Sequence, residues 1–439
     1  MWQRTTRRRA AAAIPGAALA GGVLGAACAA PGAGGATGGE APAGAAGPPV
    51  QLTYLHQWGP TQGHGPITDT LLARFREQHP AIRIEGVFSS TYYQKLAAML
   101  AGGEVPDVVT YNLAQVPLLV KKGVVVPAET LSRGATRLNL ADLLPAAREM
   151  ATFDGKLAVV PYVLNSSGLA LNAALYQRQG LDAGSPPATW DDLLEQARRL
   201  TGKDGDKDVW GTVFPRGTAD PVSPLLAAIW QNGGDLVDAQ RRVVLWTQPP
   251  AVEALQFQVD LVHRYRVAPY PDPANGEAGG VALWHIPPGN ISALQLRIKD
   301  AFPWTTAELP RRRAQATTVG GHSLAVLRSG RAEELAWRFV HWYVTPEVNA
   351  EYLVATTTLP PWRASEQHAR WQAYARDEPR IRPFVRMLGY ARPTPKLSRW
   401  EDVIGILARA RDAAGAAERT PREALEDAAR EAQPLIAEG

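Results

Sequence analysis

The chain has 439 residues, of which 46 are Lys or Arg and 42 are Asp or Glu. Four of the basic residues, Arg4, Arg7, Arg8 and Arg9, lie within the first 27 positions, which contain no acid, so the rest of the chain carries no net charge. A neutral body argues against nucleic acid as the main partner, because nonspecific phosphate binding needs a basic surface. A single cysteine excludes an intramolecular disulfide, and the eight scattered histidines show no zinc-ligand spacing, so we expect no metal and no cofactor.

The N-terminus is typical of an export signal. Residues 1–27 consist of a basic segment, an apolar segment rich in Ala and Gly, and small residues at the end. The apolar segment is too weakly hydrophobic for a good membrane span. Thr6-Arg7-Arg8 resembles a twin-arginine signal. An ordinary basic segment fits equally well, so the export route stays open.

The only cysteine, Cys28, ends the motif "LGAAC", which resembles a bacterial lipobox. In that motif the cysteine is acylated and becomes the first residue of the mature protein. Gly25 departs from the aliphatic residue that the motif normally has, and a plain signal peptide cut after an alanine is the alternative. Residues 28–49 are mostly Ala, Gly and Pro, which cannot repay their ordering entropy, so we predict a flexible tether.

The body alternates strand and helix patterns. Strands are predicted over residues 50–55, 82–88 and 107–111, helices over 67–80 and 92–103, and apolar runs follow at 155–162 and 168–172. Further helices begin at Thr189, with Asp192 as its capping-box acid, and at Thr420, followed by Pro421 and Glu423. This alternation predicts α/β layers with mostly parallel sheets. Residues 50–439 are more than a single hydrophobic core usually supports, so we expect two lobes.

Catalytic and nucleotide-binding signatures are missing from the sequence. It has no GxxxxGK[ST] phosphate loop, no GxGxxG after a strand, no GxSxG elbow and no cysteine in the body. An exported α/β chain with 13 Trp and 12 Tyr and no such signature favours binding over catalysis.

Several blocks, in order along most of residues 50–436, resemble the extracellular solute-binding proteins of family 1. These are the carbohydrate-binding components of ABC importers and include the maltose-binding proteins. The blocks are "LTYLHQWG", "KLAAMLAGGEVPDVVTYN", "GKLAVVPYVLNSSGLALNAALYQRQGLDAGSPPATWDDLLEQARRLT" and "GGVALWHIPPGNISAL". No single motif is diagnostic, but their order and spacing are.

The resemblance implies a two-lobed periplasmic-binding-protein fold of the α/β class. Each lobe would be a mostly parallel sheet flanked by helices, and crossover hinge strands would join the lobes. We expect residues 50–165 and 323–360 in the N-terminal lobe and residues 166–322 and 361–439 in the C-terminal lobe. The chain would cross near residues 165–172, 317–324 and 355–365.

The resemblance also implies the function. The lobes would close on a sugar or oligosaccharide and deliver it to the transmembrane subunits of an ABC permease. The protein would be a monomer without enzymatic activity, without nucleic-acid partners, and lipid-anchored on the outer face of the cytoplasmic membrane.

Candidate ligand residues follow from sugar chemistry. Aromatic rings stack on the apolar faces of a sugar, polar groups bind its hydroxyls, and both are expected on loops after strands. Asn290 stands where many relatives carry a stacking Trp, which is a departure from malto-oligosaccharide binders. The predicted ligand-binding residues are Gln57, Trp58, Tyr111, Asn112, Asn165, Trp230, Trp284, His285, Asn290, Gly321, His322, Trp362, Arg392 and Trp400.

Two alternatives remain at this point. Arg392, Lys396 and Arg399 in "ARPTPKLSRW" form either a solvated basic loop or an anion site, because glycerol-phosphate-binding relatives use an Arg in this region. The ligand would then be glycerol 3-phosphate or a glycerophosphodiester. The more remote alternative is an exported glycan-active enzyme, which needs a carboxylate pair that no sequence pattern supplies.

Overall fold

The computed structural model describes residues 48–60, 63–215, 222–238, 240, 242–271, 276–330 and 332–437. Residues 47–439 form one compact unit. The predicted signal peptide, Cys28 and all of the predicted tether except its last two residues lie outside the described residues. They therefore stay predictions.

Strands and helices alternate along the chain, as the sequence predicts. The strands are β1 (Val50–His56), β2 (Ile82–Phe88), β3 (Val108–Asn112), β4 (Thr152–Phe153), β5 (Lys156–Leu157), β6 (Val160–Ser166), β7 (Gly168–Asn172), β8 (Gly202–Asp204), β9 (Lys207–Val209), β10 (Leu283–Ile286), β11 (Trp304–Ala307), β12 (Thr317–Val326) and β13 (Ala391–Pro393).

The α-helices and the short 3-10 helices used below complete the described elements. The α-helices are α1 (His64–Gln78), α2 (Tyr92–Gly102), α3 (Val116–Lys121), α4 (Ala128–Leu131), α5 (Pro145–Ala151), α6 (Ala173–Arg178), α7 (Trp190–Leu200), α8 (Ser223–Gln231), α9 (Pro249–His263), α10 (Ile291–Ile298), α11 (Glu333–Tyr343), α12 (Pro346–Thr356), α13 (Arg363–Gln367), α14 (Ala369–Asp377), α15 (Arg382–Met387), α16 (Trp400–Gly415) and α17 (Pro421–Ala437). The 3-10 helices are η1 (Leu113–Gln115), η5 (Pro288–Asn290) and η6 (Pro379–Ile381).

Local sequence signals set several boundaries. The side chain of Thr189 accepts a hydrogen bond from the backbone of Asp192, whose carboxylate accepts one from Thr189, so α7 begins with the predicted capping box. Thr420 and Glu423 make the same exchange at the start of α17. Helix α1 begins at His64, one turn before the predicted start. Its buried face includes Leu71, Leu72 and Phe75.

The larger sheet has six strands. Its order is β13-β12-β3-β1-β2, and β6 pairs with β12. Strand β1 runs parallel to both β2 and β3, whereas β12 runs antiparallel to β3 and to β6. Strands that belong to local β-α units are therefore parallel, and the strand that arrives from the other half of the chain is antiparallel.

The smaller sheet differs in direction from the expected mostly parallel one. Its order is β10-β7-β11, and β7 runs antiparallel to both neighbours. Strands β10 and β11 consequently run in the same direction as each other. The physical reason is the route of the chain: β7 enters directly from β6 of the larger sheet rather than from a β-α unit of its own half.

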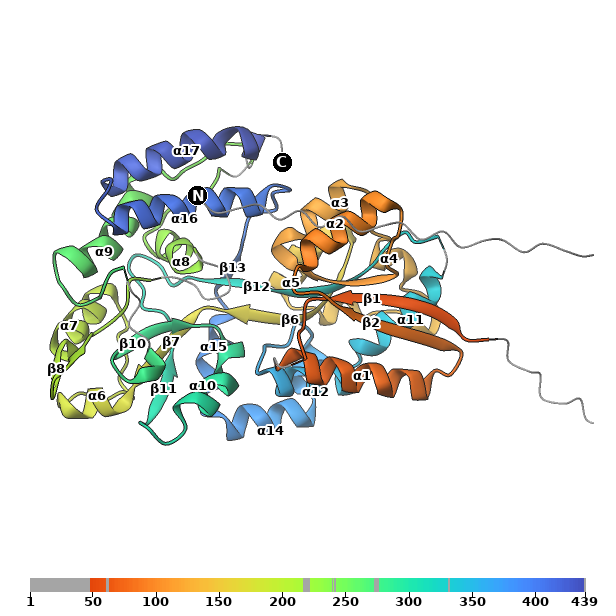
Figure 1. Cartoon of the computed structure of the whole chain (residues 1–439), viewed down its shortest axis with the longest axis horizontal. Helices are drawn as coiled ribbons and strands as arrows, with labels where there is room; N and C mark the ends of the chain where they lie inside the picture. Colours follow the sequence, from red (N-terminus) through yellow and green to blue (C-terminus); the bar gives the residue numbers. More distant parts are fainter. Residues whose placement is uncertain are drawn as a thin grey trace, which may run out of the picture. The chain divides into compact units, whose positions relative to one another are not determined.

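Three chain segments lie side by side: β6, β12 and the segment around Leu359. Strand β6 pairs with β12 along its length, and Leu164 exchanges two backbone hydrogen bonds with Leu359. In Figure 1 the ribbons of β6 and β12 run between a group of elements containing α1 to α4 and a group containing α6 to α9. These segments overlap the residue ranges of the three predicted crossings, which stay predictions. The residue limits of the lobes remain predictions, and β13, from the range assigned to the second lobe, pairs with β12.

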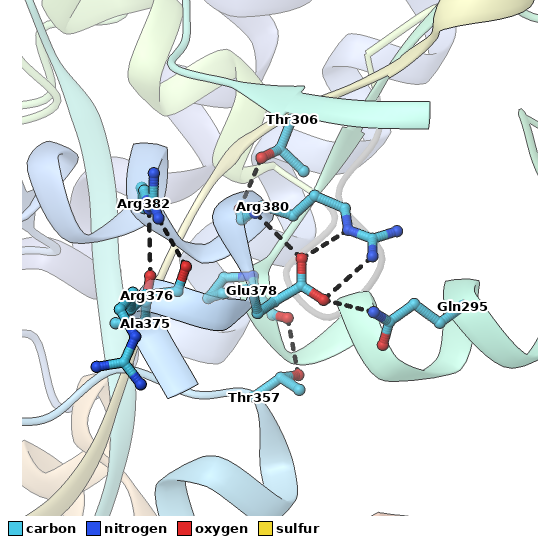
Figure 2. A network of polar contacts seen from close by, with 9 residues as sticks. Gln295, Thr306, Thr357, Ala375, Arg376, Glu378, Arg380 and Arg382 are labelled. Carbon is cyan, nitrogen blue, oxygen red and sulfur yellow. Dashed lines mark hydrogen bonds and ion pairs between the residues drawn. The ribbon is translucent and has the colours of Figure 1, made fainter. Parts of the chain in front are cut away.

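A polar network fixes the chain that follows the third of these segments (Figure 2). The Glu378 carboxylate, 8% exposed, accepts hydrogen bonds from Gln295 of α10 and from the guanidinium of Arg380. The Thr306 hydroxyl of β11 donates to the backbone carbonyl of Arg380, and the Arg380 guanidinium lies 4.5 Å from the centre of the Trp304 ring. The buried carboxylate is thus paired and ties η6 to α10, and the Thr306 hydroxyl ties η6 to β11.

Candidate functional site

A cleft of about 540 Å³ lies where β6 and β12 meet the ends of β1, β3 and β10 and the first turns of α16. The loop after β1 and the end of β3 contribute from one side, and β10 and α16 contribute from the other. Eight of the predicted ligand residues line this cleft. They are Gln57, Trp58, Asn112, Asn165, His285, Gly321, His322 and Trp400.

Fifteen further residues line the cleft but were not predicted from the sequence. Ser166 and Ser167 follow Asn165, and Glu401 follows Trp400, so proximity to a predicted residue could have found them. Tyr93 and Gln115 are placed by packing and carried no sequence signal. The missed residues are Tyr93, Ala114, Gln115, Ser166, Ser167, Ser223, Ile286, Pro287, Thr318, Val319, Gly320, Thr394, Glu401, Ile404 and Gly405.

The Trp58 ring forms an aromatic wall of the cleft. It stacks on His64 with ring centres 4.2 Å apart and meets the His322 ring edge-on at 4.8 Å. Its indole N–H donates to the Tyr162 hydroxyl at 3.0 Å, and that tyrosine is fully buried. Both the plane and the rotation of the indole are therefore fixed.

Gln57 determines which ring nitrogen of neutral His322 carries the hydrogen. The Gln57 amide nitrogen lies 2.8 Å from His322 Nε2, and because an amide nitrogen can only donate, Nε2 accepts. A neutral imidazole then carries its proton on Nδ1. This Nδ1–H has no protein partner, although the atom is buried.

Unpaired polar atoms gather on the residues that line the cleft. Asn165 Oδ1, Ser166 Oγ, His285 Nδ1, His322 Nδ1 and Gln115 Oε1 are buried without a protein hydrogen-bond partner. Each such atom costs about 1–3 kcal/mol if it stays unpaired. A polar ligand that supplies both donors and acceptors would remove this cost.

Burial lowers the pKa of His322 to about 3, with a smaller contribution from His64, and lowers that of His285 to about 4. The unfolded chain takes up these protons near pH 6.5, so stability is present above that pH and is lost as the pH falls towards the pKa values of the folded protein.

We expect protonation linked to His322 alone to lower the free energy of unfolding by about 2 kcal/mol between pH 7 and pH 5. Urea unfolding at pH 7, 6 and 5 checks this. The loss should be smaller by that amount in His322→Gln, and an equal loss in both proteins would contradict it.

Charge is sparse in the cleft. Glu401 is the only acid among its described lining residues, and none of them is Lys or Arg. The Glu401 carboxylate accepts a hydrogen bond from the Gln115 amide. Burial and, to a lesser extent, this carboxylate raise the pKa of Tyr111 to about 12.

Three predicted tryptophan contacts lie in packed regions outside the cleft lining. Trp230, 2% exposed, donates its N–H to Asp235 Oδ1 at 3.1 Å. Trp362, 4% exposed, donates to the backbone carbonyl of Pro161 at 2.8 Å. Trp284 packs closely on the backbone of Gly276, and only its neighbour His285 reaches the cleft.

Tyr111, Asn290 and Arg392 also lie outside the cleft lining. Tyr111 is buried in β3 and borders a neighbouring cavity. Asn290 ends η5, directly before α10. The Arg392 guanidinium donates to Asp235 Oδ2 at 2.7 Å and lies 4.8 Å from the centre of the Trp230 ring. The predicted basic loop therefore does not bring Arg392 to the cleft.

No group of three His, Cys, Asp or Glu side chains suited to a metal ion is found within the described residues. The same residues contain no helix that is both long enough and apolar enough to cross a membrane.

Comparisons with known proteins identify one family and several relatives. The family model of bacterial extracellular solute-binding proteins matches residues 70–377. The sn-glycerol-3-phosphate-binding periplasmic protein of Salmonella paratyphi A is 22% identical over 416 residues, covering 89% of this chain and 94% of the relative.

Solved structures show the same fold. The cyclic α-maltosyl-1,6-maltose binding protein of Arthrobacter globiformis is 24% identical, with a TM-score of 0.78 over 89% of this chain and 100% of that one. An ABC substrate-binding protein of Listeria monocytogenes, solved with cycloalternan, is 21% identical, with a TM-score of 0.77 over 88% of this chain and 99% of that one. These likenesses confirm the predicted two-lobed fold.

Proposed function

Because this chain belongs to the family of bacterial extracellular solute-binding proteins, we propose that it captures a neutral sugar or oligosaccharide for an ABC importer. The observation that carries the proposal is the lining of the cleft. Hydroxyl, amide and imidazole groups alternate there with the rings of Trp58 and Trp400, and the described lining has no cation. This combination suits a molecule with many hydroxyls and apolar C–H faces.

Closure between the lobes is the proposed working motion. The cleft takes residues from both sides of the strands β6 and β12, so a ligand that pairs with both sides favours the closed form. The permease would recognise that form. Cys28 as a lipid anchor, residues 28–49 as a tether, the monomeric state and the location outside the cytoplasmic membrane belong to the same proposal.

A phosphate ligand is the second candidate, because relatives such as the Salmonella protein are named for sn-glycerol 3-phosphate. Glu401 in the cleft opposes it, since a carboxylate repels an anion. Arg392 is paired with Asp235 outside the cleft lining. We propose no catalysis, because a single described carboxylate in the cleft does not supply the pair that glycoside hydrolysis requires.

A thermal-shift panel of neutral mono- and oligosaccharides, sugar phosphates and sn-glycerol 3-phosphate tests the assignment. At one hundred times its Kd, a ligand adds about 2.7 kcal/mol to the unfolding free energy, which for a body of this size is a rise of about 3 °C in Tm. We expect a neutral sugar to give the largest shift and to be recovered unchanged. A larger shift with sn-glycerol 3-phosphate, or no shift with any sugar, would contradict the proposal.

A further inference from the structure

A second cavity of about 410 Å³ opens beside the cleft. Its walls come from α2, η1 and α3 on one side and from the start of α16 on the other. Four residues line both cavities: Tyr93, Gln115, Trp400 and Glu401. We call the second cavity the side pocket.

The chemistry of the side pocket differs from that of the cleft. Most of its wall is aliphatic or aromatic. Its polar lining residues are Gln94, Gln115, Lys122, Ser398, Arg399, Glu401 and Asp402. The apolar wall consists of Leu96, Ala97, Leu100, Leu118, Leu119, Tyr111 and Trp400. Sugar hydroxyls placed against the apolar wall would lose their water without gaining partners there, so that wall suits an apolar group better than a second sugar ring.

The boundary between the two cavities combines polar and aromatic groups. The Gln115 amide donates to the Glu401 carboxylate there, and the other polar atom of that amide, Oε1, is buried without a protein partner. The rings of Tyr93 and Trp400 lie at the same boundary. A ligand crossing this boundary would meet hydrogen-bonding groups first and apolar walls beyond them.

We propose that the ligand is a two-part molecule, a neutral glycoside whose sugar occupies the cleft and whose apolar alkyl or aryl group occupies the side pocket. This rests on the proposed sugar-binding function and names the substrate class. The shared lining residues identify the occupant, because an apolar group attached to a sugar at Trp400 would be held next to the aliphatic wall. The wall takes residues from both sides of the cleft, so closure would bury that group.

The test compares methyl and hexyl maltoside, followed by the same pair built on the best sugar of the panel. Ala97→Trp fills the side pocket from an exposed position on α2, and Ala98→Trp is the matched control, since Ala98 is exposed and does not line the pocket. We expect the wild type and Ala98→Trp to bind the hexyl glycoside at least about tenfold more tightly than the methyl glycoside. In Ala97→Trp the ratio should fall to about one, because the indole takes the space of the hexyl chain.

A sugar-independent readout separates this inference from the sugar assignment. The neutral dye N-phenyl-1-naphthylamine should bind the wild type and Ala98→Trp about tenfold more tightly than Ala97→Trp. If a methyl glycoside binds and the hexyl glycoside binds no better, the inference is wrong and the sugar assignment stands. If no sugar binds but the dye shows the Ala97→Trp loss, the apolar subsite stands and the sugar assignment falls. Equal dye affinity in the wild type and in Ala97→Trp would overturn the inference.

Discussion

Replacing Gly321 by alanine is expected to lower the free energy of unfolding by about 3 kcal/mol or more. A Cβ at this position would lie 2.1 Å from the carbonyl oxygen of Val163 and 3.0 Å from the Cα of Leu164. Both atoms belong to the backbone of β6, which cannot rotate away as a side chain can. The alanine would therefore push β12 away from β6.

The neighbouring glycine is the matched control. A Cβ on Gly320 would meet no atom within 4 Å, so Gly320→Ala should change the unfolding free energy by less than about 1 kcal/mol. Urea unfolding of the three proteins at one pH measures the difference. If Gly321→Ala unfolds within 0.5 kcal/mol of the wild type, on the order of ordinary surface substitutions, the close approach of the two strands is not a structural requirement.

Gly321→Ala should also weaken ligand binding by more than its loss of stability alone would explain. Strand β6 carries Asn165, and β12 carries His322, so separating the two strands moves cleft residues relative to each other. A misplacement on the order of 1 Å is enough to break a hydrogen bond. Isothermal titration of Gly321→Ala well below its unfolding temperature separates this loss of affinity from unfolding.

Sequence reasoning located the cleft residues that follow the ends of strands. Gln57 and Trp58 come directly after β1, and Asn112 ends β3, where the carboxyl ends of parallel strands share one edge of a sheet. The crossing strand β12 brings Gly321 and His322 to the same edge by pairing with β3. These positions depend on where each strand ends, which hydrophobic patterning reveals.

Aromatic residues away from strand ends were less predictable. A tryptophan fills a core as readily as it lines a site, because its ring is apolar and its single N–H needs only one partner. Trp230 and Trp362 find that partner in Asp235 and in the Pro161 carbonyl. Only its place directly after β1 distinguishes Trp58, whose partner is also internal but whose ring borders the cleft.

The side pocket could not be predicted for a different reason. Its apolar wall combines leucines of α2 and α3 with Trp400, which lies about 280–300 positions later in the chain. Each leucine follows ordinary amphipathic helix spacing and would be assigned to the core. Only the packing of α16 beside η1 shows that these side chains enclose a space.

Trp58→Ala should weaken binding of the best sugar of the panel by about 30- to 150-fold, equivalent to about 2–3 kcal/mol. The indole is held between His64 and His322 and is fixed by its hydrogen bond to Tyr162, so it presents a rigid apolar face to the cleft without an ordering cost. Alanine removes the face and leaves water in its place. Trp58→Phe keeps part of the face and should lose less than about tenfold.

Trp362→Phe supplies the comparison that separates binding from stability. Trp362 is as buried as a core residue and donates to the Pro161 carbonyl, but it lies outside the cleft lining. Its loss should lower the unfolding free energy by about 1–3 kcal/mol through the unpaired carbonyl and change the Kd less than about threefold. Titration calorimetry and urea unfolding of both variants measure the two effects. Because the effect at position 58 comes from the ring that faces the ligand, equal affinity losses for Trp58→Ala and Trp362→Phe would show that Trp58 acts through general destabilisation.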